Sequence, residues 1–158
     1  MATIDKGLFS EIAVILLLFA IVIGFSYYQE ELYNNKNNEI RETCFDNNCF
    51  QVEISDSDEE RMLGLMSREE LDENKGMLFA FEQEGEYSFW MKDTLIPLDI
   101  VWINENKEIV FIMENAVPCL MEECDVINPQ ASALYVLEIN SGISQKIGLE
   151  IGEKVRFK

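Results

Sequence analysis

Apolar residues form one long run near the N-terminus, and the rest of the chain carries only short apolar segments. Residues 12–25 are all apolar or glycine, and mostly apolar or tyrosine positions extend this run to residues 8–28. About 20 residues in a helix span roughly 30 Å of hydrocarbon. The pattern predicts a transmembrane anchor over residues 8–28. The alternative is a signal peptide cleaved after Ser26, since Gly24 and Ser26 place small residues at the two preferred positions.

The charges that flank this segment predict its orientation. Lys6 and the terminal amine are the positive charges before it, and acidic residues predominate after it. Because positively charged flanks tend to stay in the cytoplasm, we expect residues 1–7 inside the cell. Residues 29–39 are polar and without periodicity, which is typical of a linker. The expected protein is a single-pass cell-membrane protein, held in the lipid bilayer by residues 8–28, with an extracytoplasmic domain over residues 40–158.

Short alternating segments separated by turn residues follow from residue 40 onward, and they predict strands. We expect strands at residues 50–54, 77–81, 109–113, 135–139 and 153–158, with two more inside residues 87–103. Ser57 and Glu60 form a capping-box pattern that starts a short helix through Met66. Ser141 is expected to cap a second short helix that ends at Gly148. This order predicts a mainly β, antiparallel sandwich with two short helices.

Composition then narrows the possible partners and the chemistry. The formal net charge is -18 and the pI is near 4.2, so a nucleic-acid partner is not expected, because such binding needs clustered lysine and arginine. The chain has no histidine, which removes Ser-His-Asp and Cys-His catalysis and His-ligated metals. We expect no cofactor and no metal. Asp56, Asp58 and Glu60 have calcium-loop spacing, but Arg61 stands where the tight-turn glycine belongs.

The four cysteines occur as two pairs with the same spacing, Cys44 with Cys49 and Cys119 with Cys124. Three disulfide connectivities are possible, and a four-thiolate zinc site is a further alternative. Because thiols oxidise outside the cytoplasm, the predicted location favours disulfides within each pair. Crossed disulfides and zinc remain open at this point.

A set of short motifs along residues 40–158 resembles a known family. The motifs, in chain order, are Gly64-Leu65-Met66 with Arg68, Gly76-Met77-Leu78-Phe79, Phe89-Trp90-Met91-Lys92-Asp93-Thr94, Pro97-Leu98-Asp99, Val136-Leu137-Glu138 and Gly142. They are similar to the domain of unknown function family 192, an uncharacterised ancient conserved region. Asp93 departs from the family, which more often has asparagine there. The resemblance implies a compact, jelly-roll-like β domain, often behind a signal or anchor segment, with a Pro-Cys loop similar to residues 118–124. It implies no established activity.

The charged residues inside apolar segments are the candidates for chemistry. Asp99 and Glu138 lie among apolar neighbours, so we expect both carboxyl groups to be partly buried and to need partners. One interpretation is a structural ion-pair network with Lys92, Arg61 and Arg68. A second is an exposed ligand site for an anion or a carbohydrate, formed by Arg61, Arg68, Trp90, Lys92, Thr94 and Asp99. A third is catalysis by Asp99 and Glu138 as a carboxylate pair, which requires them to share one cleft roughly 5–10 Å apart.

These observations favour a membrane-tethered extracytoplasmic binding or accessory domain for an anionic or carbohydrate ligand of the cell envelope. A carboxylate-dependent hydrolase acting on an envelope glycan is one alternative. The other is a structural module that recruits another envelope protein.

Overall fold

The computed structural model describes residues 15–28 and 42–158 of the chain. The chain divides into two units, Met1–Glu39 and Ile40–Lys158, and each is considered by itself. Residues 15–28 are helical; residues 8–14 of the predicted anchor, the predicted cytoplasmic residues 1–7 and the predicted linker lie outside the described residues. Within residues 15–28 and 42–158, no helix combines the length and the apolar character needed to cross a bilayer.

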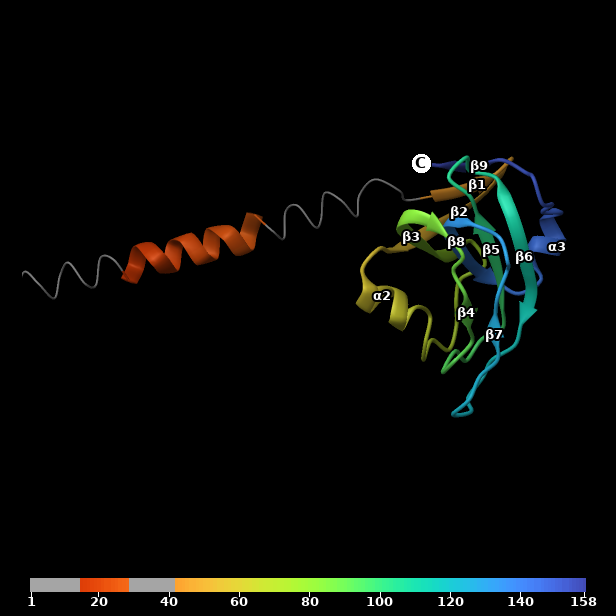
Figure 1. The fold of residues 1–158 in the computed structure, drawn as a ribbon, viewed down its shortest axis with the longest axis horizontal. Helices are drawn as coiled ribbons and strands as arrows, with labels where there is room; N and C mark the ends of the chain where they lie inside the picture. The colour runs from red at the N-terminus through yellow and green to blue at the C-terminus, as the bar shows by residue number, and fades with distance from the viewer. Residues whose placement is uncertain (1–14, 29–41) are drawn as a thin grey trace, which may run out of the picture. The chain divides into compact units, whose positions relative to one another are not determined.

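The second unit is mainly β, as predicted, and its described residues, 42–158, form nine strands and two short helices (Figure 1). Its elements are β1 (Glu42–Phe45), β2 (Asn48–Ser55), α2 (Asp58–Leu63), β3 (Lys75–Gly85), β4 (Phe89–Trp90), β5 (Leu98–Ile103), β6 (Ile109–Ala116), β7 (Val126–Ile127), β8 (Ala133–Asn140), α3 (Ile143–Ile147) and β9 (Val155–Phe157). Seven strands form one curled sheet in the order β6-β5-β8-β3-β2-β1-β9, and β4 pairs with β7 in a small second sheet.

The predicted antiparallel sandwich is therefore wrong in its arrangement. A seven-stranded sheet and a two-stranded sheet replace the two antiparallel sheets of a sandwich. The large sheet is mixed, because β2 and β3 pair in parallel while its other neighbouring strands are antiparallel. A parallel pair needs a crossover between its strands, and the segment containing α2 supplies it. The jelly-roll-like arrangement that the family resemblance implied is corrected in the same way. Of the two strands expected within residues 87–103, β5 joins the large sheet and the short β4 joins the small one.

The two helices begin and end for different reasons. Ser57 accepts a hydrogen bond from the Glu60 amide at 3.2 Å, and Glu60 accepts one from the Ser57 amide at 3.0 Å, which confirms the predicted capping box. The α2 helix ends at Leu63 rather than at Met66, because Gly64 turns the chain with a φ of 48°. Ser141 does not cap α3. The N-cap position is occupied by Gly142, which has no side chain to accept a hydrogen bond from the helix. The predicted end at Gly148 is confirmed.

The β5 strand is buried along its whole length and separates two apolar clusters on opposite faces of the sheet. Leu98, Ile100 and Trp102 belong to one cluster, and Val101 and Ile103 belong to the other. Side chains in a strand alternate between faces, and here both faces are covered. Burying a side chain of this size contributes about 1.5–3 kcal/mol to stability, which makes β5 a central element of the domain.

Asp99 is the charged residue inside β5, and backbone amides satisfy its carboxylate. The side chain has no exposed surface. Oδ1 accepts a hydrogen bond from the Asn115 amide at 2.9 Å, and Oδ2 accepts one from the Ser144 amide at 2.8 Å. The carboxylate therefore joins the end of β6 to the start of α3, where no residue of the helix itself provides a cap. No ion pair between Asp99 and a lysine or arginine is found in the described part of the chain.

Glu138 is also buried, but it lies on the other face of the sheet. It pairs with Met77 of β3 and Ile100 of β5, while Asp99 pairs with Ile139. Residues paired across antiparallel strands share a face, so Asp99 and Glu138 point to opposite sides. Burial among apolar side chains raises the pKa of Glu138 to about 8, because desolvation disfavours the charged carboxylate. At neutral pH the group is predominantly protonated.

We expect Asp99→Asn to lower the free energy of unfolding by about 2–4 kcal/mol. The neutral amide has one acceptor oxygen where the carboxylate has two, so one buried backbone N–H loses its acceptor and the other keeps only an uncharged one. Urea unfolding of the variant measures this loss. Asp93→Asn is the matched control, because Asp93 is exposed and an exposed substitution of this kind changes stability by about 0.5 kcal/mol or less. Equal stabilities for the two variants would contradict the structural role of Asp99.

Glu138 predicts a specific pH dependence of stability. The folded state keeps the Glu138 proton up to a pKa of about 8, whereas the unfolded chain releases it near 4.5. Over that interval the folded state binds more protons, so the unfolding free energy falls as the pH rises, by up to about 5 kcal/mol, and then levels off above pH 8. Glu138→Gln should remove this decrease, and Glu84→Gln, at an exposed position, should retain it. Parallel pH profiles for wild type and Glu138→Gln would refute the assignment.

Candidate functional site

The structure does not bring the predicted site residues together in one place. Asp99 and Glu138 are enclosed on opposite faces of the sheet, so they share no cleft of the kind that a carboxylate pair requires. Arg61 lies in α2, which ends at Leu63, and Arg68 lies beyond the helix. Trp90, Lys92 and Thr94 lie in and directly after β4.

The two arginines are held by nearby oxygen atoms. Arg61 donates from Nη1 to the carbonyls of Asp56 at 2.6 Å and Ala80 at 2.8 Å, and from Nη2 to Asp58 at 2.7 Å. Its guanidinium also lies 5.3 Å from the centre of the Phe81 ring. These contacts tie the start of α2 to β3, which is a structural role.

Arg68 forms a two-point ion pair with Glu53 of β2, with distances of 2.6 and 2.5 Å. The hydrogen bond from Arg68 lowers the pKa of Glu53, against the opposing effect of its partial burial. The same bond raises the pKa of Arg68. The pair is partly exposed, so its contribution to stability is modest. Arg68 is engaged in this pair and, like Arg61, does not reach Asp99 or Glu138.

Trp90, Lys92 and Thr94 do lie at the same end of the domain. Trp90 pairs with Val126 in the small sheet and keeps 49% of its surface exposed. The Lys92 ammonium donates to the Glu122 carbonyl at 3.0 Å, and its backbone pairs with Cys119. Thr94 is buried. Lys92 therefore holds the loop between β6 and β7 against the segment that follows β4.

The cysteines form two local disulfides, Cys44–Cys49 and Cys119–Cys124, with Cα–Cα distances of 4.0 and 6.0 Å. Cys44 and Cys49 face each other across the β1–β2 hairpin, and the second pair closes the loop between β6 and β7. Figure 1 shows β1 and β7 at opposite ends of the domain. The four sulfur atoms therefore do not converge as a four-thiolate zinc site would require.

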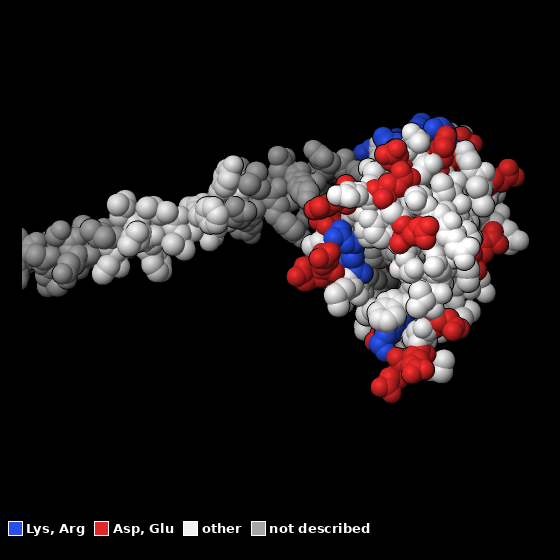
Figure 2. All heavy atoms as spheres, in the orientation of Figure 1, with Lys and Arg blue, Asp and Glu red and all other residues white. Residues whose placement is uncertain are grey.

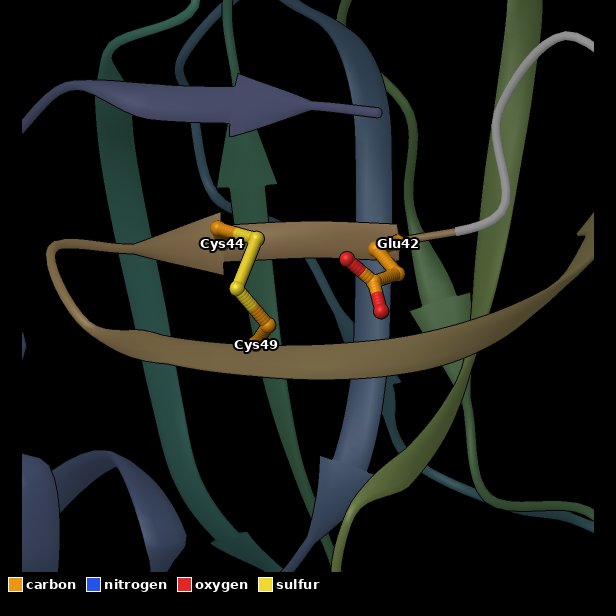
Figure 3. A group of neighbouring side chains, drawn as sticks. All are labelled: Glu42, Cys44 and Cys49. Carbon is orange, nitrogen blue, oxygen red and sulfur yellow. A yellow bond between two sulfur atoms is a disulfide. The ribbon is translucent and has the colours of Figure 1, made fainter.

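Among the described residues, one group of three side chains of metal-binding types has its potential ligand atoms within 4.8 Å of one another. The group consists of Glu42, Cys44 and Cys49 (Figure 3). The two sulfur atoms are bonded to each other, so they are not the thiolates that bind metals. The Glu42 carboxylate faces the Lys158 ammonium at 3.6 Å. We therefore assign this group to the stability of the hairpin and not to metal binding.

Exposed apolar side chains gather where β4, β7 and the disulfide loop meet. We call this surface the apolar end, and it comprises Trp90, Val117, Leu120, Met121 and Val126, of which the last four are 61–69% exposed. The segments that carry them meet here, because Trp90 pairs with Val126 and the Cys119 backbone pairs with Lys92. A cavity of about 260 Å³ opens beside them, lined by Met91, Met113, Met121 and Ile127 among others.

The sequence pattern predicted Trp90, Lys92 and Thr94 as site residues but did not predict the apolar residues of the loop. One signal was available: a predicted loop, closed by a cysteine pair, carried several large apolar residues between acidic ones. A solvated loop has no reason to expose so many apolar side chains together. Across the visible face of the domain, Figure 2 shows many acidic side chains, and the positive side chains there each adjoin acidic ones.

Comparison with known proteins places the domain in a family whose function is not established. Two solved bacterial structures are similar to this chain, each at 34% sequence identity. A Sinorhizobium meliloti protein, described as a "putative transcription regulator", has a TM-score of 0.65, with 69% of this chain and 82% of that chain covered. A Novosphingobium aromaticivorans protein of unknown function has a TM-score of 0.64, with 68% and 75% covered.

A search of curated proteins gives no match. Residues 41–157 match the model of the family DUF192, described as "Uncharacterized ACR". The match extends over nearly the whole second unit and agrees with the motifs around Trp90, Asp99 and Glu138. The chain belongs to the DUF192 family.

Proposed function

We propose that this protein is a membrane-tethered accessory domain that binds another component of the cell envelope through its apolar end. The observation that carries this proposal is the exposure of Trp90 beside a loop that presents Leu120 and Met121 to solvent. Large exposed apolar patches on soluble domains are typical of interaction sites. Tryptophan and methionine are also enriched in protein interfaces. The recruiting module expected as one alternative therefore becomes the leading interpretation.

The distribution of charge supports an interaction surface more than an anion site. Arg61 and Arg68 each make ion pairs with acidic side chains, and Lys92 donates to two backbone carbonyls. An anionic ligand would have to displace these oxygen acceptors on a protein whose net charge is -18. A hydrolase that uses Asp99 and Glu138 lacks support for a different reason, because their opposite orientations prevent them from acting on one bond.

The anchor and the extracytoplasmic location remain part of the proposal. Their support is the apolar run over residues 12–25, the acidic excess after it and the local pairing of all four cysteines. Disulfides are typical of proteins outside the cytoplasm. In this arrangement the bilayer holds residues 8–28 and the DUF192 domain reaches its partner from the membrane surface.

The full chain should remain with the membrane fraction after alkaline extraction, because an apolar span of about 20 residues inserts stably. A chain that begins at residue 40 should be soluble, and this truncation is the control. Immunoblotting of the two fractions measures the distribution. Release of the uncleaved full-length chain into the soluble fraction would contradict the anchor.

A photo-crosslinking residue placed at Trp90 should form a discrete adduct with a polypeptide in intact cells, because this position lies within the proposed interface. The same residue at Met62 is the matched control, since Met62 is 76% exposed but belongs to α2. Mass spectrometry of the adducts identifies their chemical class. Identical adducts from both positions, or none from position 90, would argue against the apolar end as the binding surface.

A further inference from the structure

The cavity at the apolar end has the size and lining of a pocket for a single side chain. Its volume is about 260 Å³, below the roughly 300–1,000 Å³ of typical small-molecule sites. Met91 and Met113 contribute to its wall, and Met121 stands at its exposed side. Methionine is unbranched and polarizable, so a lining of this kind adapts to different apolar side chains. The cavity therefore favours one large apolar side chain over a whole small molecule.

Acidic residues lie at this pocket. Glu123 and Asp125 are among its lining residues. Two further acidic residues, Glu122 next to Glu123 and Asp93 next to Lys92, are exposed in the two segments that meet there. Lys92 is the nearby positive charge, and its ammonium donates to the carbonyls of Met121 and Glu122. An occupant with positive charges next to its apolar side chain would gain attraction from this surface, whereas an acidic one would be repelled.

The loop that presents these residues is held in place before any partner arrives. The Cys119–Cys124 disulfide closes it. The Cys119 amide donates to the Met91 carbonyl at 3.1 Å, and the Asp93 amide donates to the Cys119 carbonyl at 2.9 Å. A surface fixed in this way loses less conformational entropy on binding. The apolar residues are therefore exposed by a constrained loop and not by a segment free to fold inward.

We infer that the apolar end binds a basic polypeptide segment, in which one large apolar side chain enters the pocket while flanking lysine or arginine side chains contact the acidic residues around it. This inference rests on the proposed function and specifies the partner. Charge complementarity decides among possible occupants. A second copy of this chain carries the same acidic surface, and an anionic lipid surface would be repelled by it. Carbohydrate recognition needs convergent polar donors, which the apolar lining does not provide.

The test uses the full chain in nanodiscs of zwitterionic lipid, with empty nanodiscs as the blank. The probe is a fluorescent peptide with one phenylalanine flanked by two lysines on each side. Two matched peptides replace the phenylalanine by alanine or the lysines by glutamates. Fluorescence anisotropy should show saturable binding of the first peptide, with affinity at least about tenfold higher than for either matched peptide. Added salt should weaken this binding, because the charge contacts are near the surface.

Variants then locate the site on the protein. Met121→Gln should weaken binding about tenfold, because it places a polar group at the pocket. Met62→Gln is the matched control, at a similarly exposed methionine on α2, and should bind as wild type. Glu123→Gln combined with Asp125→Asn should weaken binding and reduce its salt dependence, whereas Glu69→Gln combined with Glu70→Gln should change neither.

Three outcomes would overturn the inference. The first is equal binding of the lysine and glutamate peptides, the second is full binding by Met121→Gln, and the third is no saturable binding of the lysine peptide. A discrete crosslink from position 90 together with any of these would leave the proposed function standing with a different partner. Absence of both the crosslink and peptide binding would remove the proposed function as well.

Discussion

The fold depends on burying β5 on both faces of a single sheet. All six residues from Leu98 to Ile103 are buried, and two apolar clusters cover the two sides. A strand in this position cannot leave a charge unsatisfied, because an unpaired buried carboxylate costs many kcal/mol. Asp99 meets this requirement with two backbone amides, from Asn115 and Ser144. The same two bonds fix the end of β6 and the start of α3.

Glu138 meets the same constraint differently. Desolvation raises its pKa to about 8, so the Glu138 carboxyl group is largely neutral at neutral pH. The Asp99 carboxylate, in contrast, is stabilised by two backbone N–H donors. The two carboxyl groups thus have separate structural solutions on opposite faces, and neither is presented to a substrate. Arg61 and Arg68 are paired with neighbouring acidic side chains. These charged groups are therefore engaged within the domain and are not available to bind a ligand. The binding surface that we propose lies instead in the exposed residues of the apolar end, outside the buried core.

Local features of the sequence predicted local features of the structure. The capping box at Ser57 and Glu60, the end of α3 at Gly148 and the burial of Asp99 all follow from residues close in sequence. The local cysteine pairs follow from spacing and expected compartment. The parallel pairing of β2 with β3 did not follow, because it depends on where the crossover containing α2 returns to the sheet. Alternation identifies a strand but does not choose its neighbour.

The candidate site was predicted only in part, again because it depends on contacts between residues that are far apart in the sequence. Alternation within β5 and within β8 placed Asp99 and Glu138 on apolar faces, but only the pairing of Asp99 with Ile139 shows that these are opposite faces. Likewise Trp90 was recognisable as an unusual residue beside Lys92. Its partner Val126 begins β7, and Met121 lies in the preceding loop, which the β4–β7 pair and the contact of Cys119 with Lys92 bring to this end of the domain. The spacing of residues along the sequence does not predict that this loop lies next to β4.

Amide hydrogen exchange at Asn115 and Ser144 tests the central claim most directly. Asn115 is an exposed residue that itself has a positive φ of 52°, so its amide would exchange quickly without the Asp99 carboxylate. If Asp99 joins β6 and α3 inside a doubly covered sheet, both amides should exchange only through global unfolding, as slowly as the amides of Ile100 and Val101. Exchange of both amides at the rate of exposed loop residues would contradict this account of the domain.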